Sequence, residues 1–382
     1  MQQPLDIALA ALFAAAFAVP AYAYFVFPAI LYGLARWRAR AFHVDEAHTP
    51  AVTLLISAYN EATVIADKIE NSLALDYPAD RLQILVLDDG SSDGTAEIAA
   101  GFAFRGVVHV RVEGRGGKNA AINEAWPQVT GEITVFSDAN AMYAPDAIRR
   151  LVAWFADARI GCVCGELRYI SADTGSALGE NLYWKYEQYL KRLQSKMGEV
   201  LVLNGSIFAI RSALFQPLHP KIANDFQTPV FVANQGQAIV YEPAAVAIEK
   251  VAESAGDEFG RKARIIARGF EGFFYYLRTF RGMRLFQFIS QKFLRWMVWL
   301  AMIVMLAANL FLLEYAVFQV LLAGQLGFYA LACLGPLLNR LRVPGIAIPY
   351  YFCIINLGAL VGFWRFIARR QKASWEPPAS AR

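Results

Sequence analysis

Acidic residues stand at the ends of short apolar runs in this chain. Asp88 and Asp89 end one run, and Asp138 ends a later one, with Asn140 two residues further on. Ligands of open α/β sheets bind at the carboxyl ends of the strands. Carboxylates there can hold Mg²⁺ or Mn²⁺ together with substrate phosphates. We therefore expect a ligand and metal site on these residues, with the neutral carbonyl of Asn140 as the weaker metal ligand.

Two more polar segments belong to the same pattern. Ala58-Tyr59-Asn60-Glu61 follows an earlier apolar run, and Gly114-Arg115-Gly116-Gly117-Lys118 lies between the two acidic ends. Glycine lets the backbone approach an anion, and lysine supplies a point charge for phosphate. The GxxxxGK[ST] spacing of a P-loop is absent, so the glycine-rich segment on its own predicts phosphate binding only weakly.

Two later segments offer further candidates. Asn204-Gly205-Ser206 interrupts an apolar run and is a turn signal. Asp225, in the segment Ala223-Asn224-Asp225-Phe226, fits either a helix cap or a base with a raised pKa. None of the four histidines has a partner at i+4 or lies in an HExxH pattern. Chemistry based on a histidine-activated nucleophile is therefore disfavoured, and an enzyme of this sequence would use carboxylates and a metal.

Alternating elements must position these residues. Between residues 46 and 256, short apolar runs alternate with polar, helix-like segments, and no run is long enough to span a bilayer. This pattern predicts an α/β domain.

The rest of the chain is strongly apolar. Hydrophobic residues make up 57% and charged residues 18%, against about 25% charged in soluble chains, so a disordered or fibrous chain is excluded. Residues 7–35 carry no charge and are followed by Arg36, Arg38 and Arg40, which predicts a membrane anchor with its basic end in the cytoplasm. Further spans are expected at 295–313, 315–339 and 343–365.

Charge and cysteine content limit the partners. A net charge of +4 is too small to argue for nucleic acid, and the four cysteines form no disulfide or zinc pattern. Basic and aromatic residues are interleaved over 257–292, which predicts helices lying in the membrane interface. An ordinary buried helix pair is the alternative.

Taken in order, the segments AYNE, DDGSSDGT, GGKNAAIN, SDAN, LNGSIFAIR and NDF resemble a membrane-bound family 2 glycosyltransferase. The nearer resemblance is to cellulose synthase-like enzymes, with chitin and hyaluronan synthases as relatives. It implies the GT-A fold, which is the Rossmann-like α/β fold of nucleotide-diphospho-sugar transferases. It also implies a UDP-sugar donor, Mg²⁺ or Mn²⁺, and inverting transfer that forms a β-linkage.

The resemblance implies a role for each candidate in the donor site. The uridine would be held by Tyr59, Glu61, Asp89 and Asp88, and the diphosphate would be contacted by Lys118.

The same resemblance implies the metal ligand and the base. Asp138 would bind the divalent ion as the first acid of a DXD motif, whose third position is Asn140 here. Asp225 matches the general base, although Asn224 precedes it where the family has an acid. The residues expected near the acceptor are Asn204, Gly205 and Ser206.

One departure concerns processive synthesis. Arg264 matches the arginine of the family's Gln-x-x-Arg-Trp motif and would belong to the donor site, but the Gln and Trp are missing around it. A later Gln291–Trp296 segment has one residue too many. We expect it to lead into a span, with Arg295 at the headgroup level and Trp296 in the aromatic belt.

Two interpretations of the acceptor therefore stay open. A polysaccharide synthase of the exopolysaccharide or capsule type is favoured by the interface region, the later spans and Arg264. Transfer of one sugar to a lipid-linked acceptor is favoured by the missing Gln and Trp and by the small number of spans. A nucleotide-binding transport or scaffold protein is a third class, disfavoured because the spans carry almost no charge. Polymer export would call for a homo-oligomer or an export partner.

The expected organisation has five parts: an anchor at 1–45, a GT-A domain at 46–256, interface helices at 257–292, three spans at 293–368 and a basic tail at 369–382. We expect a multi-pass protein of the cell inner (plasma) membrane with a cytoplasmic catalytic domain. Parity of the spans puts the C-terminus outside, whereas its basic residues favour the inside, so its side stays open.

Overall fold

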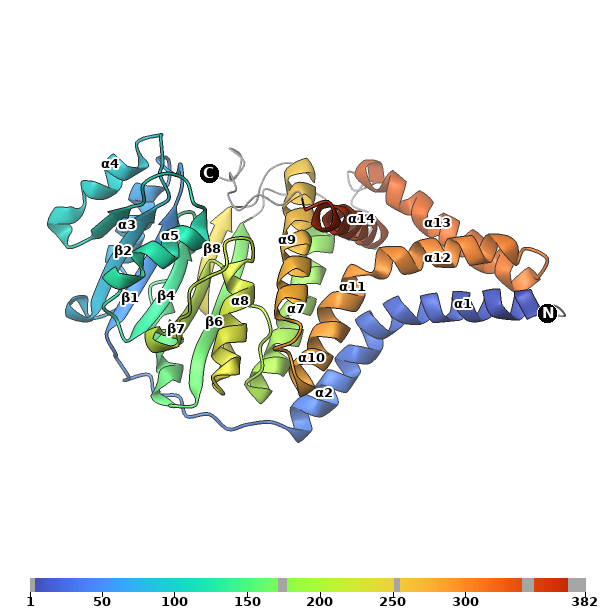
Figure 1. Cartoon of the computed structure of the whole chain (residues 1–382), viewed down its shortest axis with the longest axis horizontal. Coiled ribbons are helices and arrows are strands. Elements are labelled where there is room, and N and C mark those ends of the chain that lie inside the picture. Colours follow the sequence, from blue (N-terminus) through green and yellow to red (C-terminus); the bar gives the residue numbers. More distant parts are fainter. Residues whose placement is uncertain (1–3, 171–176, 251–254, 339–346, 370–382) are drawn as a thin grey trace.

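An eight-stranded mixed sheet organises the part of the chain that carries the candidate residues (Figure 1). The computed structural model describes residues 4–170, 177–250, 255–338 and 347–369. The sheet order is β3-β2-β1-β4-β7-β6-β8-β5. The strands are β1 (Val52–Ala58), β2 (Leu82–Asp88), β3 (Val108–Arg111), β4 (Ile133–Asp138), β5 (Met142–Tyr143), β6 (Ile160–Ile170), β7 (Ile207–Arg211) and β8 (Ala238–Lys250).

The central strands bring the acidic ends together. β1 pairs in parallel with β2 on one side and with β4 on the other. The register aligns Ala58 with Asp88 and Ser57 with Asp138. Because the three strands run in the same direction, their carboxyl ends meet at one edge of the sheet. The predicted α/β domain is confirmed, and the strand-end acids lie at one edge, as expected.

Helices cover both faces of this sheet. Side chains alternate across each strand, so Leu54 packs on one side with α3 (Ile65–Leu73) and α6 (Ala147–Val152). Leu55 packs on the other side with α5 (Lys118–Ala125) and α8 (Asn224–Asn234). The remaining short helix of the domain, α4 (Thr95–Ala100), follows β2.

Long helices join the sheet domain to the apolar part of the chain. α7 (Ala177–Met197) and α9 (Ala255–Tyr276) stand between the sheet and the apolar helices (Figure 1). Phe273 of α9 is buried in the same core cluster as α8, whereas Phe274 and Tyr275 are about half exposed. One face of α9 is therefore an ordinary core face, while the predicted position of this region in the membrane interface stays a prediction.

Apolar helices make up the remainder. They are α1 (Pro4–Ala21), the π-helical turn Tyr22–Val26, α2 (Phe27–Trp37), α10 (Gly282–Phe288), a second π-helical turn (Ile289–Phe293), α11 (Leu294–Trp296), α12 (Val298–Phe311), α13 (Ala316–Leu338) and α14 (Ala347–Ile367). Among the described residues, the helices at 4–37, 316–335 and 348–367 are long and apolar enough to cross a membrane.

The span expected at 295–313 is the exception. α12 joins the preceding segment Gly282–Trp296 at a bend of 56°, and only the two together reach the length of a span. The described part of the chain thus holds three candidate membrane helices, or four if the bent pair is one span. The domain boundaries remain predictions. The basic segment Asn339–Arg342 and the tail beyond Arg369 lie outside the described residues.

Candidate active site

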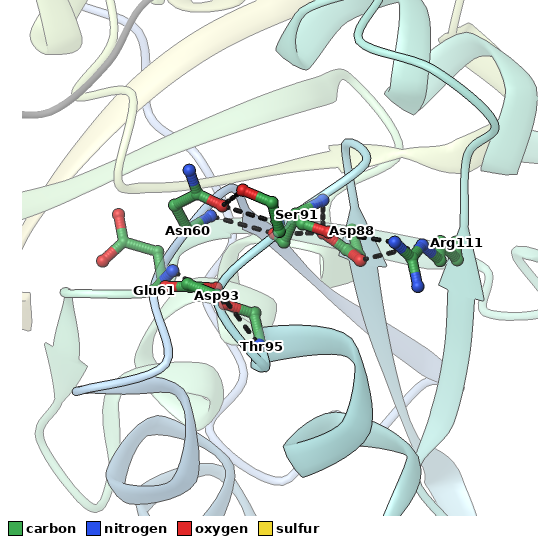
Figure 2. Close-up of polar contacts among 8 residues, drawn as sticks. Asn60, Glu61, Asp88, Ser91, Asp93, Thr95 and Arg111 are labelled. Atoms are coloured by element: carbon green, nitrogen blue, oxygen red, sulfur yellow. Dashed lines mark hydrogen bonds and ion pairs between the residues drawn. The ribbon is translucent and has the colours of Figure 1, made fainter.

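The loops after β1 and β2 are tied to each other by hydrogen bonds (Figure 2). The Asn60 amide donates to the Ser91 hydroxyl at 2.9 Å, and the Glu61 amide donates to the Thr95 hydroxyl at 2.8 Å. In return, the Ser92 amide donates to the side chain of Asn60 at 2.9 Å. Asn60 has a φ of 52°, a conformation that asparagine tolerates better than most residues. The AYNE and DDGSSDGT segments therefore form one structured rim.

Asp88 supports this rim through hydrogen bonds with Ser91. Its side chain is fully buried and accepts hydrogen bonds from both the amide (3.0 Å) and the hydroxyl of Ser91. Arg111 of β3 lies 3.8 Å from its other oxygen (Figure 2). These contacts hold the loop in place, and the expected contact of Asp88 with a uridine stays a prediction.

Asp89 binds the glycine-rich segment instead. Its carboxylate accepts from the amides of Gly116 (3.1 Å) and Gly117 (3.0 Å). Gly90 next to it has a φ of +74°, and a Cβ there would lie 2.6 Å from the carbonyl oxygen of Gly114. Burial raises the pKa of Asp89, and the two amide hydrogen bonds act against that rise. The carboxyl end of β2 and the glycine-rich segment are thus one unit.

The other two donor candidates line the same edge. The guanidinium of Arg115 lies over the ring of Tyr59, 4.1 Å from its centroid. Glu61 is buried, with 8% of its surface exposed. An aromatic ring and a carboxylate at this edge suit the base and ribose of a nucleotide, because a base can stack and a ribose hydroxyl can donate.

Lys118 and Asp138 form an ion pair at the centre of the site. Lys118 begins α5, directly after Gly117, and its ammonium group contacts one oxygen of Asp138. The other oxygen of Asp138 accepts from the Ser206 hydroxyl at 3.0 Å. About a third of each side chain is exposed, 31% for Lys118 and 33% for Asp138. The pair is therefore accessible to a ligand.

The turn at 204–206 lies directly against Asp225. A Cβ on Gly205 would come within 3.6 Å of the Asp225 carboxyl carbon. The amide of Leu203 donates to the Asp225 carbonyl at 3.1 Å. Asn204 faces the interior, where its side chain accepts from Lys191 and donates to the Gly165 carbonyl. The structure thus brings the candidate acceptor turn and the candidate base together, and Asn204 holds the turn in place.

Asp225 is not the residue that caps its helix. α8 begins at Asn224, the capping position is Ala223, and no side chain caps it. Burial raises the pKa of Asp225, while the charges of Lys118, Arg268 and Lys191 act to lower it. Of the two interpretations of Asp225, the cap is therefore disfavoured and the base remains.

This shift leads to a pH-dependence prediction. A base works only while it is deprotonated, so transfer should fall as the pH drops through the raised pKa of Asp225. The acidic limb of kcat/KM should then lie above the ordinary aspartate value of about 4. A pH profile of initial rates at low donor concentration measures it. A limb at or below the ordinary value would argue against Asp225 as the base.

Arg264 is not among the charges that act most strongly on Asp225. Burial lowers the pKa of Arg264 to about 9, and the charges of Arg268, Arg261 and Arg365 act in the same direction. The arginine of α9 that acts on Asp225 is Arg268, one turn later. Arg268 also donates to the carbonyls of Lys221 (3.2 Å) and Ile222 (3.3 Å), just before α8.

Two ionisable residues at the site were not predicted from the sequence. Burial, together with the charge of Asp138, raises the pKa of Glu249 to about 7. Burial lowers the pKa of Lys68 to about 7, with Asp138 and Glu249 acting against the shift. The only sequence signal for Glu249 is an acid within the apolar run of β8.

The residues around Asp138 suit a hard divalent ion. Carboxylate and amide oxygens are the ligands that Mg²⁺ and Mn²⁺ prefer, and Asp138 and Asn140 supply one of each. One buried oxygen of Glu249 has no hydrogen-bond partner among the described residues. No cluster of three or more His, Cys, Asp or Glu side chains forms in that part of the chain, so substrate phosphates would have to complete the coordination.

Comparisons with known proteins agree with this geometry. Residues 53–218 match the model of glycosyl transferase family 2. The chain is 35% identical over 118 residues to a beta-monoglucosyldiacylglycerol synthase of Trichormus variabilis, covering 30% of this chain and 25% of that protein. It is 28% identical over 239 residues to a poly-beta-1,6-N-acetyl-D-glucosamine synthase of Staphylococcus aureus, covering 60% of this chain and 56% of that protein. The chain thus spans about half or less of the length of these curated relatives.

A solved structure extends the similarity to nearly the whole chain. It is the mannosyltransferase PcManGT from Pyrobaculum calidifontis in complex with GDP-Man and Mn²⁺, with a TM-score of 0.71 and 25% identity. The match covers 91% of this chain and 99% of that one. Together with the sheet order and the position of the strand-end acids, these matches lead to one conclusion: the α/β domain belongs to glycosyltransferase family 2 and has the GT-A fold.

Proposed function

We propose that this protein transfers a sugar from a nucleoside-diphosphate sugar to a membrane-borne acceptor, with inversion at the anomeric carbon. The observation that carries the proposal is the position of Asp225. Its carboxyl lies against Gly205, in the field of Lys118, Arg268 and Asp138. A base and the diphosphate-binding candidates are thus within electrostatic reach of one another.

The proposed reaction is a single displacement. The acceptor hydroxyl is a poor nucleophile at neutral pH, and Asp225 takes its proton as the new carbon–oxygen bond forms. The bond from the anomeric carbon to the diphosphate breaks, and negative charge develops on the leaving group. Lys118 is placed to stabilise that charge. A divalent ion held at Asp138 and Asn140 would supply further positive charge there.

The donor side rests on the rim formed by the first two strand ends. Tyr59, Glu61 and Asp89 are proposed to contact the nucleoside. UDP is the nucleotide that the motif resemblance implies, whereas the similar mannosyltransferase was solved with GDP-Man. Both nucleotides therefore belong in the test.

The acceptor side favours addition of one sugar at a time. Ile265 stands where processive synthases carry tryptophan, and half of its surface is exposed. Trp296, the tempting substitute, packs against Phe270 with a centroid distance of 4.9 Å. A Cβ on Gly269 would meet its ring at 2.6 Å. Neither residue offers an open aromatic face on which a growing sugar chain could stack. The lipid-glucosylating relative supports the same choice.

Polymer extension is the second candidate. It is favoured by the N-acetylglucosamine polymer synthase, whose alignment covers 60% of this chain. In that case we expect a homo-oligomer or an export partner, because the three or four candidate membrane helices of the described residues leave little room to enclose a polymer.

A transfer assay on purified protein in lipid nanodiscs tests the proposal. Radiolabelled UDP- and GDP-sugars are supplied with Mn²⁺ or Mg²⁺, with and without a membrane lipid extract, and the product is sized. We expect a short, lipid-extractable product that requires the extract. Long labelled polymer made without added lipid would instead establish the second candidate. Absence of transfer from every donor and extract, with folded protein that still binds nucleotide, would contradict both.

A further inference from the structure

Glu249 reaches the metal-binding edge through strand pairing rather than through a motif. β5 pairs antiparallel with β8, with Met142 opposite Ile248 and Tyr143 opposite Ala247. Continuing this register by one residue sets Ala141 opposite Glu249. Ala141 directly follows the Asp138-Ala139-Asn140 segment, so the pairing brings an acid from a distant strand beside the first candidate ligands.

A single hydroxyl lies between the two acids. Ser206 donates to Asp138 at 3.0 Å, and it is also within hydrogen-bonding reach of Glu249. A hydroxyl has one proton to donate. With that proton on Asp138, one buried oxygen of Glu249 is left without a hydrogen-bond donor among the described residues.

Two cations near this edge, Lys68 and Lys118, are engaged elsewhere, and the charge of Arg261 also acts on Glu249. The ammonium of Lys68 donates to the Ala141 carbonyl and lies 4.0 Å from the centroid of the Tyr143 ring. Lys118 is paired with Asp138. Burying a carboxylate oxygen without a partner is costly, and two neighbouring carboxylates with an open position suit a divalent cation.

We propose that Glu249 is the second carboxylate ligand of the divalent cation. It would supply the negative charge that Asn140, the neutral third residue of the segment Asp138-Ala139-Asn140, lacks. The inference rests on the proposed function only in that the cation serves a nucleotide donor. Glu249 itself enters through cation affinity, which is measurable without any sugar transfer.

Direct measurement of Mn²⁺ binding tests the inference. The full-length protein in nanodiscs is titrated with Mn²⁺ at saturating UDP, and separately GDP, and free Mn²⁺ is followed by electron paramagnetic resonance. We expect Glu249→Gln to weaken Mn²⁺ binding at least about tenfold, as expected for loss of a metal-site carboxylate. Asn140→Ala should weaken it less. Glu242→Gln, which removes another carboxylate of β8 bonded to Trp154, is the matched control and should leave it unchanged.

The outcomes separate clearly. A Glu249→Gln protein that is folded and binds Mn²⁺ as the wild type does would overturn the inference. If that variant does not fold, Glu249→Asp decides, because it keeps the charge: weakened Mn²⁺ binding supports the inference and wild-type binding refutes it. Wild-type protein that binds Mn²⁺ and nucleotide but transfers no sugar would contradict the proposed function and leave Glu249 untouched.

Discussion

Replacing Asp225 by Asn is expected to lower the rate of sugar transfer about 10²–10⁴-fold, which is the usual contribution of a positioned general base. The change keeps the shape of the side chain and removes its ability to accept the acceptor proton. Nucleotide binding should survive, because Asp225 lies against the 204–206 turn, whereas the rim is held together by contacts such as that between Asn60 and Ser91. Product formation and nucleotide affinity, measured on the same preparation, give the two readouts.

The matched control is Asp146→Asn. Asp146 is a partly exposed aspartate that forms an ion pair with Arg150, four residues later on the surface. Its loss should leave transfer unchanged. If Asp225→Asn retained transfer within a few-fold of the wild type, Asp225 would be no more than an acid in the first turn of α8, where a negative charge favours the helix dipole. A drop in both transfer and nucleotide binding would point to a folding defect instead.

The part of the site built on parallel strands could be predicted from the sequence. Asp88, Asp89 and Asp138 each follow a short apolar run, and buried parallel strands bring their carboxyl ends to the same edge whatever the detailed register. The contact between Gly205 and Asp225 was not predicted from the sequence. It depends on how the segment before β7 packs on α8, which no local pattern encodes.

The residues that sequence analysis missed depend on long-range register and helix phase. Glu249 comes from β8, and its neighbour across the sheet is fixed by pairing with β5, more than a hundred residues earlier. Such pairing leaves no trace in the local sequence. On α9, Arg264 matched the motif, yet the arginine acting on Asp225 is Arg268. The motif therefore predicted the helix that supplies an arginine, whereas the packing of α9 determines which of its arginines acts on Asp225.

The sequence did not reveal the contacts that Arg295 and Trp296 make within the protein. Their place at the membrane headgroups and in an aromatic belt stays a prediction. Arg295 is buried with 8% of its surface exposed and pairs with Glu187 of α7. Trp296 packs against α9 at Gly269. The segment before α12 therefore packs against α7 and α9.

Replacing Glu187 by Gln is expected to destabilise the contact between α7 and the bent apolar segment, Gly282–Trp296 with α12, by about 3–5 kcal/mol. The change leaves two buried cations without their counter-charge. Glu187 contacts Arg295 with one oxygen and Lys292 with the other, at 3.0 Å for Lys292. Only 7% of the side chain of Glu187 is exposed. The thermal midpoint in nanodiscs, followed by tryptophan fluorescence, measures the loss.

Two controls frame this result. Lys185→Ala removes an exposed charge from the same helix and should leave the midpoint unchanged. Replacing Glu187, Lys292 and Arg295 together by apolar residues should restore much of the stability, since a buried ion cluster adds little over well-packed apolar side chains. A Glu187→Gln midpoint equal to that of the wild type would mean that water, rather than the carboxylate, satisfies both cations.

Loss of this contact should also reach the active site. Lys191, one turn after Glu187 on α7, holds the side chain of Asn204, and Asn204 begins the turn that lies against Asp225. Loosening α7 removes support from that turn, so Glu187→Gln should lower transfer even at temperatures where the protein is folded. Unchanged nucleotide affinity in Glu187→Gln would show that the loss of transfer comes from the 204–206 turn and not from the nucleotide-binding rim. Through α7, the bent apolar segment and the proposed base would then be structurally coupled, which fits the proposed membrane-borne acceptor.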